Sequence, residues 1–211
     1  MTHYPVFLRL GAKKVVLIGG GAVALQKIPA LLEAGAQLTV ISPEALVEIE
    51  RFAAEGKLRW EKRRYNANDL EGAALAIAAT DDDALQRQAA ADCRARNIWV
   101  NVVDVPPLCD FIAPAIVRRG DVQVAISTGG AAPALAKYLR KTLERTLGDE
   151  YAIVARLAKR VRPDVLKWPK PRRAGFWECV ASDYFIELVR RDGAERAEAK
   201  MKEWVYGNRP V

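Results

Sequence analysis

A glycine-rich turn between an apolar strand and a helix is the feature of this sequence that most constrains its fold. Residues 13–18 (KKVVLI) form a short β-branched run, residues 19–21 are all glycine, and residues 22–34 have a helical pattern that ends at Gly35. The segment fits G-x-G-x-x-A, a permitted variant of the dinucleotide-binding fingerprint. Because the strand–turn–helix context agrees with the motif, we expect this turn to bind the pyrophosphate of a dinucleotide.

The motif assigns a physical role to each of its small residues. Gly19 permits the tight turn, Gly21 lets the backbone approach a pyrophosphate, and Ala24 allows the helix to pack closely on the strand. Ala22 and Val23 begin the helix, so their backbone N–H groups are predicted to contact the cofactor. The alternative is a glycine turn that serves only packing.

The end of the second predicted strand bears on the choice of cofactor. The fingerprint expects an acidic residue there, whereas this chain has Ser42 followed by Pro43 and Glu44. Ser42 can hydrogen-bond a ribose hydroxyl, Glu44 would repel a 2′-phosphate, and no arginine stands nearby in the sequence to attract one. We therefore favour NAD over NADP. Thr80, at the end of a later strand, completes the predicted cofactor-binding residues.

Strand and helix patterns alternate over the first half of the chain. The predicted strands are residues 13–18, 37–41, 58–64, 74–79 and 99–103, and the predicted helices are residues 22–34, 43–55 and 81–96. Alternation at this spacing implies right-handed crossovers and a parallel sheet with helices on both faces. The fold class is therefore α/β, with a doubly wound Rossmann-type sheet.

The pattern changes after residue 112. Two strand patterns, residues 111–119 and 122–127, meet at a Gly-Asp turn and predict a hairpin, and a helix is expected over residues 133–147. From Tyr151 onward the pattern is helical. We predict an NAD-binding domain over residues 1–112, a hairpin and helix region over residues 113–150 that mediates dimerisation, and a helical basic region over residues 151–211.

Composition excludes several classes of protein. A hydrophobic content of 51% and a mean hydropathy of −0.07 are typical of a globular chain. Three scattered cysteines without CxxC argue against a disulfide framework or a zinc site, and the single histidine, His3, excludes a histidine-based metal or catalytic cluster. With no signal peptide and no apolar run of the roughly 18 residues that a membrane span needs, we expect a cytoplasmic protein.

The net charge of +7 is concentrated near the end of the chain. Residues 151–211 contain 14 Lys and Arg against 8 Asp and Glu, a net charge of +6. Three explanations are open: a nucleic-acid surface, a pocket rim for an acidic small molecule, or solvated helices. A non-catalytic NAD-binding module with a nucleic-acid-binding tail is therefore the alternative to an enzyme.

Several motifs together resemble one known family. They are VVLIGGGAVA (15–24), LLEAGAQLTVISPE (31–44), LAIAATDD (75–82) and NVVDVPPLCDFIAPAIVRRGDVQVAISTGGAAPALAKYLR (101–140). In this order they resemble the precorrin-2 dehydrogenase / sirohydrochlorin ferrochelatase family, which forms the N-terminal module of siroheme synthase. Without a methyltransferase domain after these motifs, the chain resembles the stand-alone form.

The resemblance implies an activity and an assembly. The family oxidises precorrin-2 to sirohydrochlorin with NAD⁺, and some members also insert Fe²⁺ to give siroheme. Members are homodimers with a Rossmann domain, a central dimerisation region and a helical C-terminal region. The resemblance thus implies an acidic tetrapyrrole substrate and NAD as cofactor. We expect no resident metal and no membrane or nucleic-acid partner.

Candidate reactive residues lie in the fourth motif. Asp104 ends a predicted strand and coincides with the family's essential aspartate; without the resemblance, a turn cap would be the favoured explanation. Asn101 is a candidate for orienting substrate or for a satisfied strand position. Ser127, Thr128 and Gly129 precede a helix, where they would either bind a substrate carboxylate or cap the helix. The family often has serine where Thr128 stands.

Overall fold

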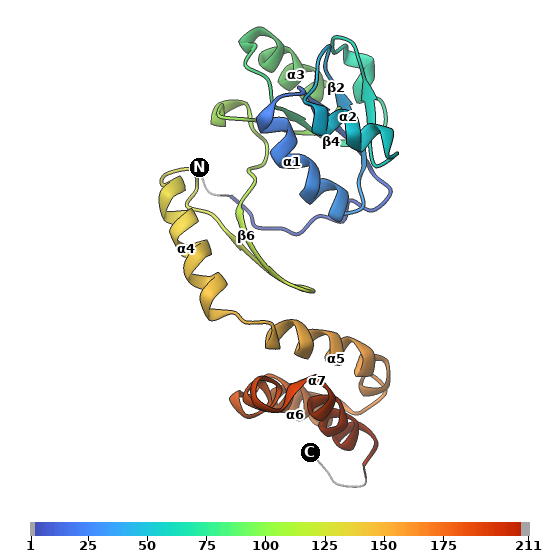
Figure 1. Ribbon diagram of the computed structural model, residues 1–211, viewed down its shortest axis with the longest axis vertical. Coiled ribbons are helices and arrows are strands. Elements are labelled where there is room, and N and C mark those ends of the chain that lie inside the picture. The colour runs from blue at the N-terminus through green and yellow to red at the C-terminus, as the bar shows by residue number, and fades with distance from the viewer. Residues whose placement is uncertain (1–2, 208–211) are drawn as a thin grey trace. The chain divides into compact units, whose positions relative to one another are not determined.

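The computed structural model describes residues 3–207, and the chain divides into two compact units (Figure 1). The first unit comprises residues 1–113 and the second residues 114–211. The boundary falls one residue beyond the predicted end of the NAD-binding domain. The further division near residue 150 stays a prediction.

The first unit is built on a parallel sheet of five strands in the order β3-β2-β1-β4-β5. The strands are β1 (Lys14–Ile18), β2 (Gln37–Ile41), β3 (Arg59–Glu61), β4 (Ala73–Ala78) and β5 (Trp99–Val102). The chain winds outward from β1 in one direction through β2 and β3, and in the other through β4 and β5. The carboxyl ends of the strands beside β1 are therefore the expected ligand crevice. The predicted α/β fold class is confirmed.

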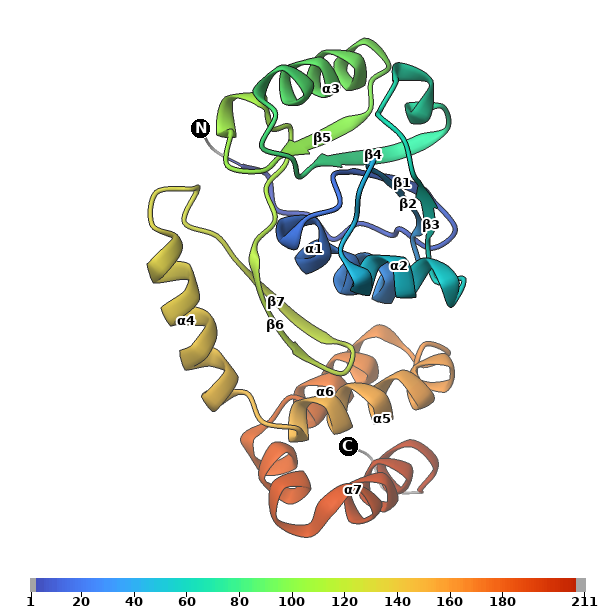
Figure 2. The ribbon, with the colours of Figure 1, turned by 45° about the horizontal axis from the view of Figure 1, so that its top comes forward.

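Helices cover both faces of this sheet (Figure 2). They are α1 (Ala22–Glu33), α2 (Val47–Ala54), α3 (Asp83–Ala95) and the short 3₁₀ helices η1 (Ala67–Leu70) and η2 (Pro106–Leu108). Every β1 residue after Lys14 is buried, because its side chains alternate between two cores. Val15 and Leu17 pack with α1 and α2, whereas Val16 and Ile18 pack with α3 and η1.

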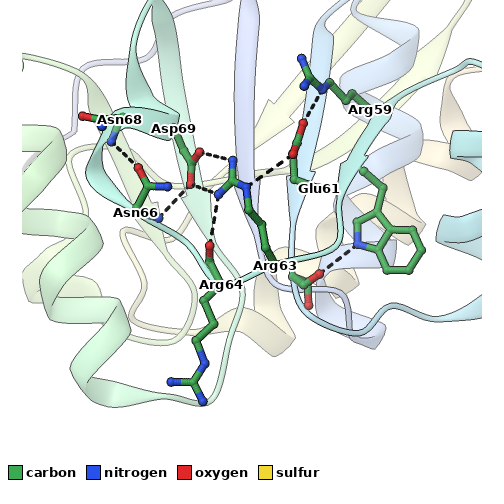
Figure 3. A network of polar contacts seen from close by, with 9 residues as sticks. Arg59, Glu61, Arg63, Arg64, Asn66, Asn68 and Asp69 are labelled. Atoms are coloured by element: carbon green, nitrogen blue, oxygen red, sulfur yellow. Dashed lines mark hydrogen bonds and ion pairs between the residues drawn. The ribbon is translucent and has the colours of Figure 1, made fainter.

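A polar network holds the chain where it leaves the edge strand β3 (Figure 3). Arg63 donates two hydrogen bonds, of 2.9 and 2.6 Å, to the Asp69 carboxylate, and its Nε lies 3.5 Å from Glu61 Oε2. Asp69 also accepts a hydrogen bond of 2.8 Å from the backbone N–H of Asn66. Burial by itself would raise the pKa of Asp69, but the hydrogen bonds from Arg63 and Asn66 outweigh it and lower that pKa.

The second unit begins with an antiparallel hairpin that is covered by one helix. Its elements are β6 (Ala115–Arg119), β7 (Val122–Ile126), α4 (Pro133–Thr146), α5 (Glu150–Val165), α6 (Lys170–Val180) and α7 (Asp183–Tyr206). Arg119 fastens the hairpin to the end of α4, since its guanidinium donates to the backbone oxygens of Glu144 at 2.6 Å and Leu147 at 2.7 Å. The predicted hairpin and helix are therefore present.

Three helices, α5, α6 and α7, enclose the core of the second unit. Phe176 and Phe185 are fully buried there, and Trp168 packs edge-on against Phe176 with ring centroids 5.7 Å apart. Gly193 has φ +84° and interrupts α7, a conformation that glycine adopts easily. In the described part of the chain, no helix combines the length and the apolar composition needed to cross a membrane.

Candidate cofactor and substrate site

The three glycines of the β1–α1 turn meet different surroundings. A Cβ on Gly19 would lie 2.1 Å from the backbone oxygen of Ala79, and Gly19 itself has φ +120°. A Cβ on Gly20 would lie 2.2 Å from the backbone oxygen of Glu44. A Cβ on Gly21 would meet no atom within 4 Å. Gly19 and Gly20 are therefore required by packing, whereas Gly21 faces open space from which a ligand can approach.

Helix α1 begins without any group that would compete with an anion. Gly21 is its N-cap, no side chain caps the helix, and its first turn contains no acidic residue. Ala22 and Val23 are exposed at this end, while Ala24 is fully buried against the sheet. The first backbone N–H groups and the positive end of the helix dipole thus form an anion-binding surface. These residues fit the pyrophosphate of a dinucleotide.

One pocket of about 420 Å³ adjoins this turn at the carboxyl ends of β1, β4 and β5. It is lined by Gly21, Ala22, Val23, Ala79, Thr80, Asp81, Asp83, Gln86, Val103, Asp104 and Val105. The pocket brings predicted cofactor-binding residues of α1 and β4 together with the predicted catalytic Asp104. Among the predicted sites of the first unit, Gly19, Ser42, Pro43, Glu44 and Asn101 are not part of its lining.

Asp104 occupies an unusual backbone conformation at the pocket wall. Its φ is +61°, in the left-handed region that aspartate and asparagine tolerate better than most residues. The preceding residue extends the sheet, since Val103 N donates to Ala78 O at 2.9 Å. The Asp104 carboxylate is exposed and forms no hydrogen bond or ion pair with the rest of residues 3–207. It is free to interact with a ligand.

The segment after Asp104 folds back along β5 and fixes this loop. Asp110 makes two contacts with Val100: its backbone N donates to Val100 O at 2.8 Å, and its carboxylate accepts from Val100 N at 3.0 Å. Asn101 is buried and its Nδ2 donates to Phe111 O at 2.9 Å. The Asn101 side chain therefore holds the returning segment, a positioning role outside the pocket.

Ser42, Pro43 and Glu44 lie at the carboxyl end of β2. The Ser42 hydroxyl hydrogen-bonds to the backbone oxygen of Glu44, and Ser42 O accepts from Trp60 Nε1 at 3.1 Å. Pro43 and Glu44 are exposed. In a doubly wound sheet, the adenosine ribose binds at the carboxyl end of the second strand. Ser42, Pro43 and Glu44 therefore lie where the motif expects ribose-binding residues.

One glycine of the turn and three polar residues of the pocket lining were not singled out in the sequence. Gly20 is required by its contact with the Glu44 backbone, and Asp81, Asp83 and Gln86 line the pocket. Asp81 and Asp83 stand directly after the buried strand β4, so the rule that ligands bind at strand carboxyl ends could have found them. Gln86 could not be found in this way, because its position depends on the rotational setting of α3.

The predicted anion site of the second unit forms a local hydrogen-bonded turn. Ser127 Oγ accepts from Gly129 N at 3.0 Å, and Thr128 Oγ1 accepts from Ala132 N at 3.1 Å. The hydroxyl oxygens thus support the turn before α4, and both hydroxyls can still donate a hydrogen bond to an anion.

Metal-binding side chains do not gather in the described residues. No group of three or more His, Cys, Asp or Glu able to hold a metal ion occurs within residues 3–207. Cys93, Cys109 and Cys179 are free thiols. Burial raises the pKa of Cys93 to about 11, so it is an inert core residue.

The sheet and its pocket define a Rossmann-type dinucleotide-binding protein. A family model described as "Putative NAD(P)-binding" matches residues 6–115, more than half of the chain, and one described as "Sirohaem biosynthesis protein central" matches residues 119–146. The chain therefore belongs to the family described as putative NAD(P)-binding, and the similarity of residues 119–146 to sirohaem biosynthesis proteins agrees with the resemblance that its motifs indicate.

Its curated relatives include siroheme synthases from several bacteria. The enzyme of Methylococcus capsulatus is 43% identical over 205 residues, covering 96% of this chain and 43% of the relative. That of Pseudomonas putida is 42% identical over 209 residues, covering 98% and 45%. The chain thus spans less than half the length of these relatives. A solved structure named SirC, precorrin-2 dehydrogenase, has the same fold, with a TM-score of 0.75, 24% identity, and coverage of 96% of this chain and 100% of that one.

Proposed function

We propose that this chain oxidises precorrin-2 to sirohydrochlorin, with NAD⁺ as the acceptor. The observation that carries the proposal is the single pocket that joins the anion-binding start of α1 to the unpaired carboxylate of Asp104. The names of the relatives, siroheme synthase and precorrin-2 dehydrogenase, support the same pathway.

Different residues of the pocket would bind the cofactor and accept the proton. Gly21, Ala22 and Val23 would hold the pyrophosphate through backbone N–H groups. When bound, the cofactor supplies a hydride acceptor. Because the oxidation removes one hydride and one proton from the substrate, a base must take the proton, and Asp104 is the candidate. Thr80, in the same lining, would position the nicotinamide end of the dinucleotide.

The charge of the pocket favours the oxidised form of the cofactor. Asp81, Asp83 and Asp104 all line it. The oxidised nicotinamide ring carries a positive charge that the reduced ring lacks, so nearby carboxylates favour binding of NAD⁺ over NADH. This asymmetry promotes dehydrogenation and release of the reduced product.

We assign NAD rather than NADP from the β2 end of the sheet. The half-buried Ser42 and the exposed Glu44 would bind the two ribose hydroxyls, and Glu44 would repel a 2′-phosphate. Arg63, which follows the neighbouring strand β3, is held by Asp69 and Glu61 and is therefore not free to attract one. Titration with both dinucleotides tests this assignment, and equal affinity for the two would contradict it.

The substrate carries many carboxylates, which suggests a role for the second unit. The hydroxyls of Ser127 and Thr128 would donate hydrogen bonds to one of them, and Gly129 would hold Ser127 in place through its N–H. The basic helices after residue 150 would attract the rest. Asn101 would act indirectly, by holding the segment that follows Asp104.

Insertion of Fe²⁺ is the second reaction that the family resemblance implies. Pyrrole protons must leave as the metal enters, and Asp104 could accept one. The ring nitrogens of the macrocycle would hold the metal, so no protein ligand set is required. Mixing the protein with sirohydrochlorin and Co²⁺ as a surrogate, beside an enzyme-free control, tests this reaction through the change in absorbance.

A homodimer is the assembly that the exposed surface of α4 favours. Leu135, Tyr138 and Leu139 lie at helical spacing and are 48%, 61% and 38% exposed, respectively. No residue of α4 is buried within the chain. An apolar stripe of this kind is typical of a helix that packs against a partner subunit.

The direct test is to mix the protein with precorrin-2 and NAD⁺ under anaerobic conditions. We expect equimolar formation of NADH and sirohydrochlorin, each followed by its absorbance. Binding of NAD⁺ without turnover of precorrin-2 would contradict the proposed substrate, and absence of NAD⁺ binding would contradict the proposal as a whole.

A further inference from the structure

Gln86 is a buried polar residue that lines the pocket beside Asp104. Gln86 belongs to α3 and is 7% exposed. Among the described residues, Gln86 and Asn101 are the buried ones with polar side chains. Its Nε2 donates a hydrogen bond of 2.6 Å to the backbone oxygen of Thr80. A buried amide in a ligand pocket is unfavourable unless its polar atoms are paired.

The contact with Thr80 fixes which way the amide points. A carbonyl oxygen can only accept, so the NH₂ group of Gln86 must face Thr80 and its Oε1 must face elsewhere. Oε1 forms no hydrogen bond with any of residues 3–207. Oε1 is also not enclosed by the protein, so a ligand in the pocket can reach this fixed acceptor.

The other acceptors nearby differ from Gln86. Asp82 caps α3, since its carboxylate accepts from the backbone N–H groups of Ala84 and Leu85. Asp81 and Asp83 line the pocket but are exposed, so water can satisfy them. Gln86 is the one polar residue of the pocket lining that is buried.

This part of the pocket corresponds to the nicotinamide half of a dinucleotide. It lies on the β4 and β5 side of the glycine turn, whereas the adenosine ribose belongs on the β2 side. The nicotinamide ring carries a carboxamide whose NH₂ is a donor without charge. We propose that Gln86 recognises this carboxamide: Oε1 accepts a hydrogen bond from it while Nε2 holds the Thr80 backbone. The proposal rests on the proposed function.

Dinucleotide analogues test the contact without any turnover. In 3-acetylpyridine adenine dinucleotide a methyl group replaces the NH₂, so the donor is lost and the rest of the molecule is kept. We expect wild type to bind the analogue about tenfold more weakly than NAD⁺, since a buried acceptor is left unpaired. In Gln86→Met, which has a similar length and only a weakly accepting thioether, the two ligands should bind within about twofold of each other.

Gln88→Met is the matched control, because Gln88 is exposed on the same helix. It should keep the wild-type preference for NAD⁺. Gln86→Leu serves as a second variant, and thermal melting monitors the folding of each. Wild type that binds the analogue as tightly as NAD⁺ would overturn the inference even if neither Gln86 variant folds.

The outcomes separate this inference from the proposed function. Binding of NAD⁺ with the same preference in wild type and Gln86→Met would refute the role of Gln86 alone. Failure of wild type to bind NAD⁺ at all would refute both.

Discussion

At the scale of single residues, the site depends on backbone conformation as much as on side-chain chemistry. Asp104 carries the carboxylate at φ +61°, and Gly19 makes the turn at φ +120°. Most residues avoid these regions, because their Cβ would clash with the backbone. The chemistry at each position is therefore tested cleanly only by substitutions that keep the backbone conformation.

Asp104→Asn is the substitution that isolates the carboxylate. Asparagine tolerates the left-handed region and is neutral, so we expect normal folding, NAD⁺ affinity close to wild type, and turnover reduced by about 100-fold or more. Asp104→Ala should lose as much activity and also about 1 kcal/mol of stability from its backbone conformation. Steady-state kinetics and thermal melting measure both effects. Turnover above one tenth of wild type in Asp104→Asn would remove Asp104 from its role.

A pair of glycine substitutions separates packing from ligand approach. Gly20→Ala should destabilise the first unit by about 1–3 kcal/mol, because its Cβ would overlap the Glu44 backbone. Gly21→Ala meets open space within the protein, so its stability should change by less than about 1 kcal/mol. Its methyl group would instead obstruct the pyrophosphate and weaken NAD⁺ binding by about tenfold or more. Denaturant titration measures the stability of each variant and calorimetry its NAD⁺ affinity. An unchanged NAD⁺ affinity in Gly21→Ala would indicate that the turn serves packing alone.

At the scale of helices and strands, the periodic segments could be predicted and their limits could not. All five predicted strands of the sheet and the three helices beside it are present. The helix expected over residues 43–55 begins later, at Val47, because Leu46 N donates to Gly20 O and holds the preceding turn. The strand expected from residue 111 begins at Ala115, because residues 109–111 are bound along β5. Such non-local contacts are absent from a local pattern.

The same limit applies to the site. Gly21, Ala22, Val23 and Thr80, marked by motif and strand end, and Asp104, marked by the family resemblance, line one pocket, and their roles stay predictions. Asn101 could not be distinguished from a ligand-binding residue, since its bond to Phe111 depends on the path of the returning loop.

The network around Asp69 predicts a pH dependence of stability. The pKa of Asp69 in the folded state is lowered from its ordinary value of 3.8. The ionised carboxylate therefore adds to the free energy of unfolding above pH 3.8, and this contribution is lost as the pH falls below 3.8 and through the lowered pKa. We expect Asp69→Asn to remove about 1 kcal/mol at neutral pH, a modest figure because Arg63 is half-exposed. The variant should also weaken the dependence of unfolding on pH between about pH 5 and pH 3.

Glu71→Gln in the same unit is the control, because Glu71 is exposed and its carboxylate forms no hydrogen bond or ion pair with residues 3–207. Urea titrations across this pH range should leave the control unchanged from wild type. An unchanged pH profile in Asp69→Asn would contradict the account of the network.

At the scale of the whole molecule, the chain consists of two units with separate cores and different charge. The first carries the nucleotide-binding pocket, and most of the net positive charge lies after residue 150. The sequence predicts this change of character from the end of strand–helix alternation. The exposed apolar stripe of α4 emerges only from the structure, which shows that the rest of the chain leaves Leu135 and Tyr138 uncovered.

Tyr138→Glu tests the proposed homodimer. A charge in the middle of the apolar stripe would have to be buried on association, so the dissociation constant should rise by at least about tenfold. Lys137→Glu, a charge reversal at an exposed polar position on the same helix, should leave the dimer largely intact. Sedimentation velocity over a range of concentrations measures both. A monomeric wild type would refute the proposed assembly.

The most direct measurement is a crystal structure of this chain with NAD⁺ bound. The account predicts the pyrophosphate on the backbone of Gly21–Val23 and the nicotinamide ring in the pocket beside Asp104 and Gln86. A nicotinamide ring on the β2 side of the glycine turn, or an Asp104 carboxylate too far from that ring for one substrate to reach both, would contradict it.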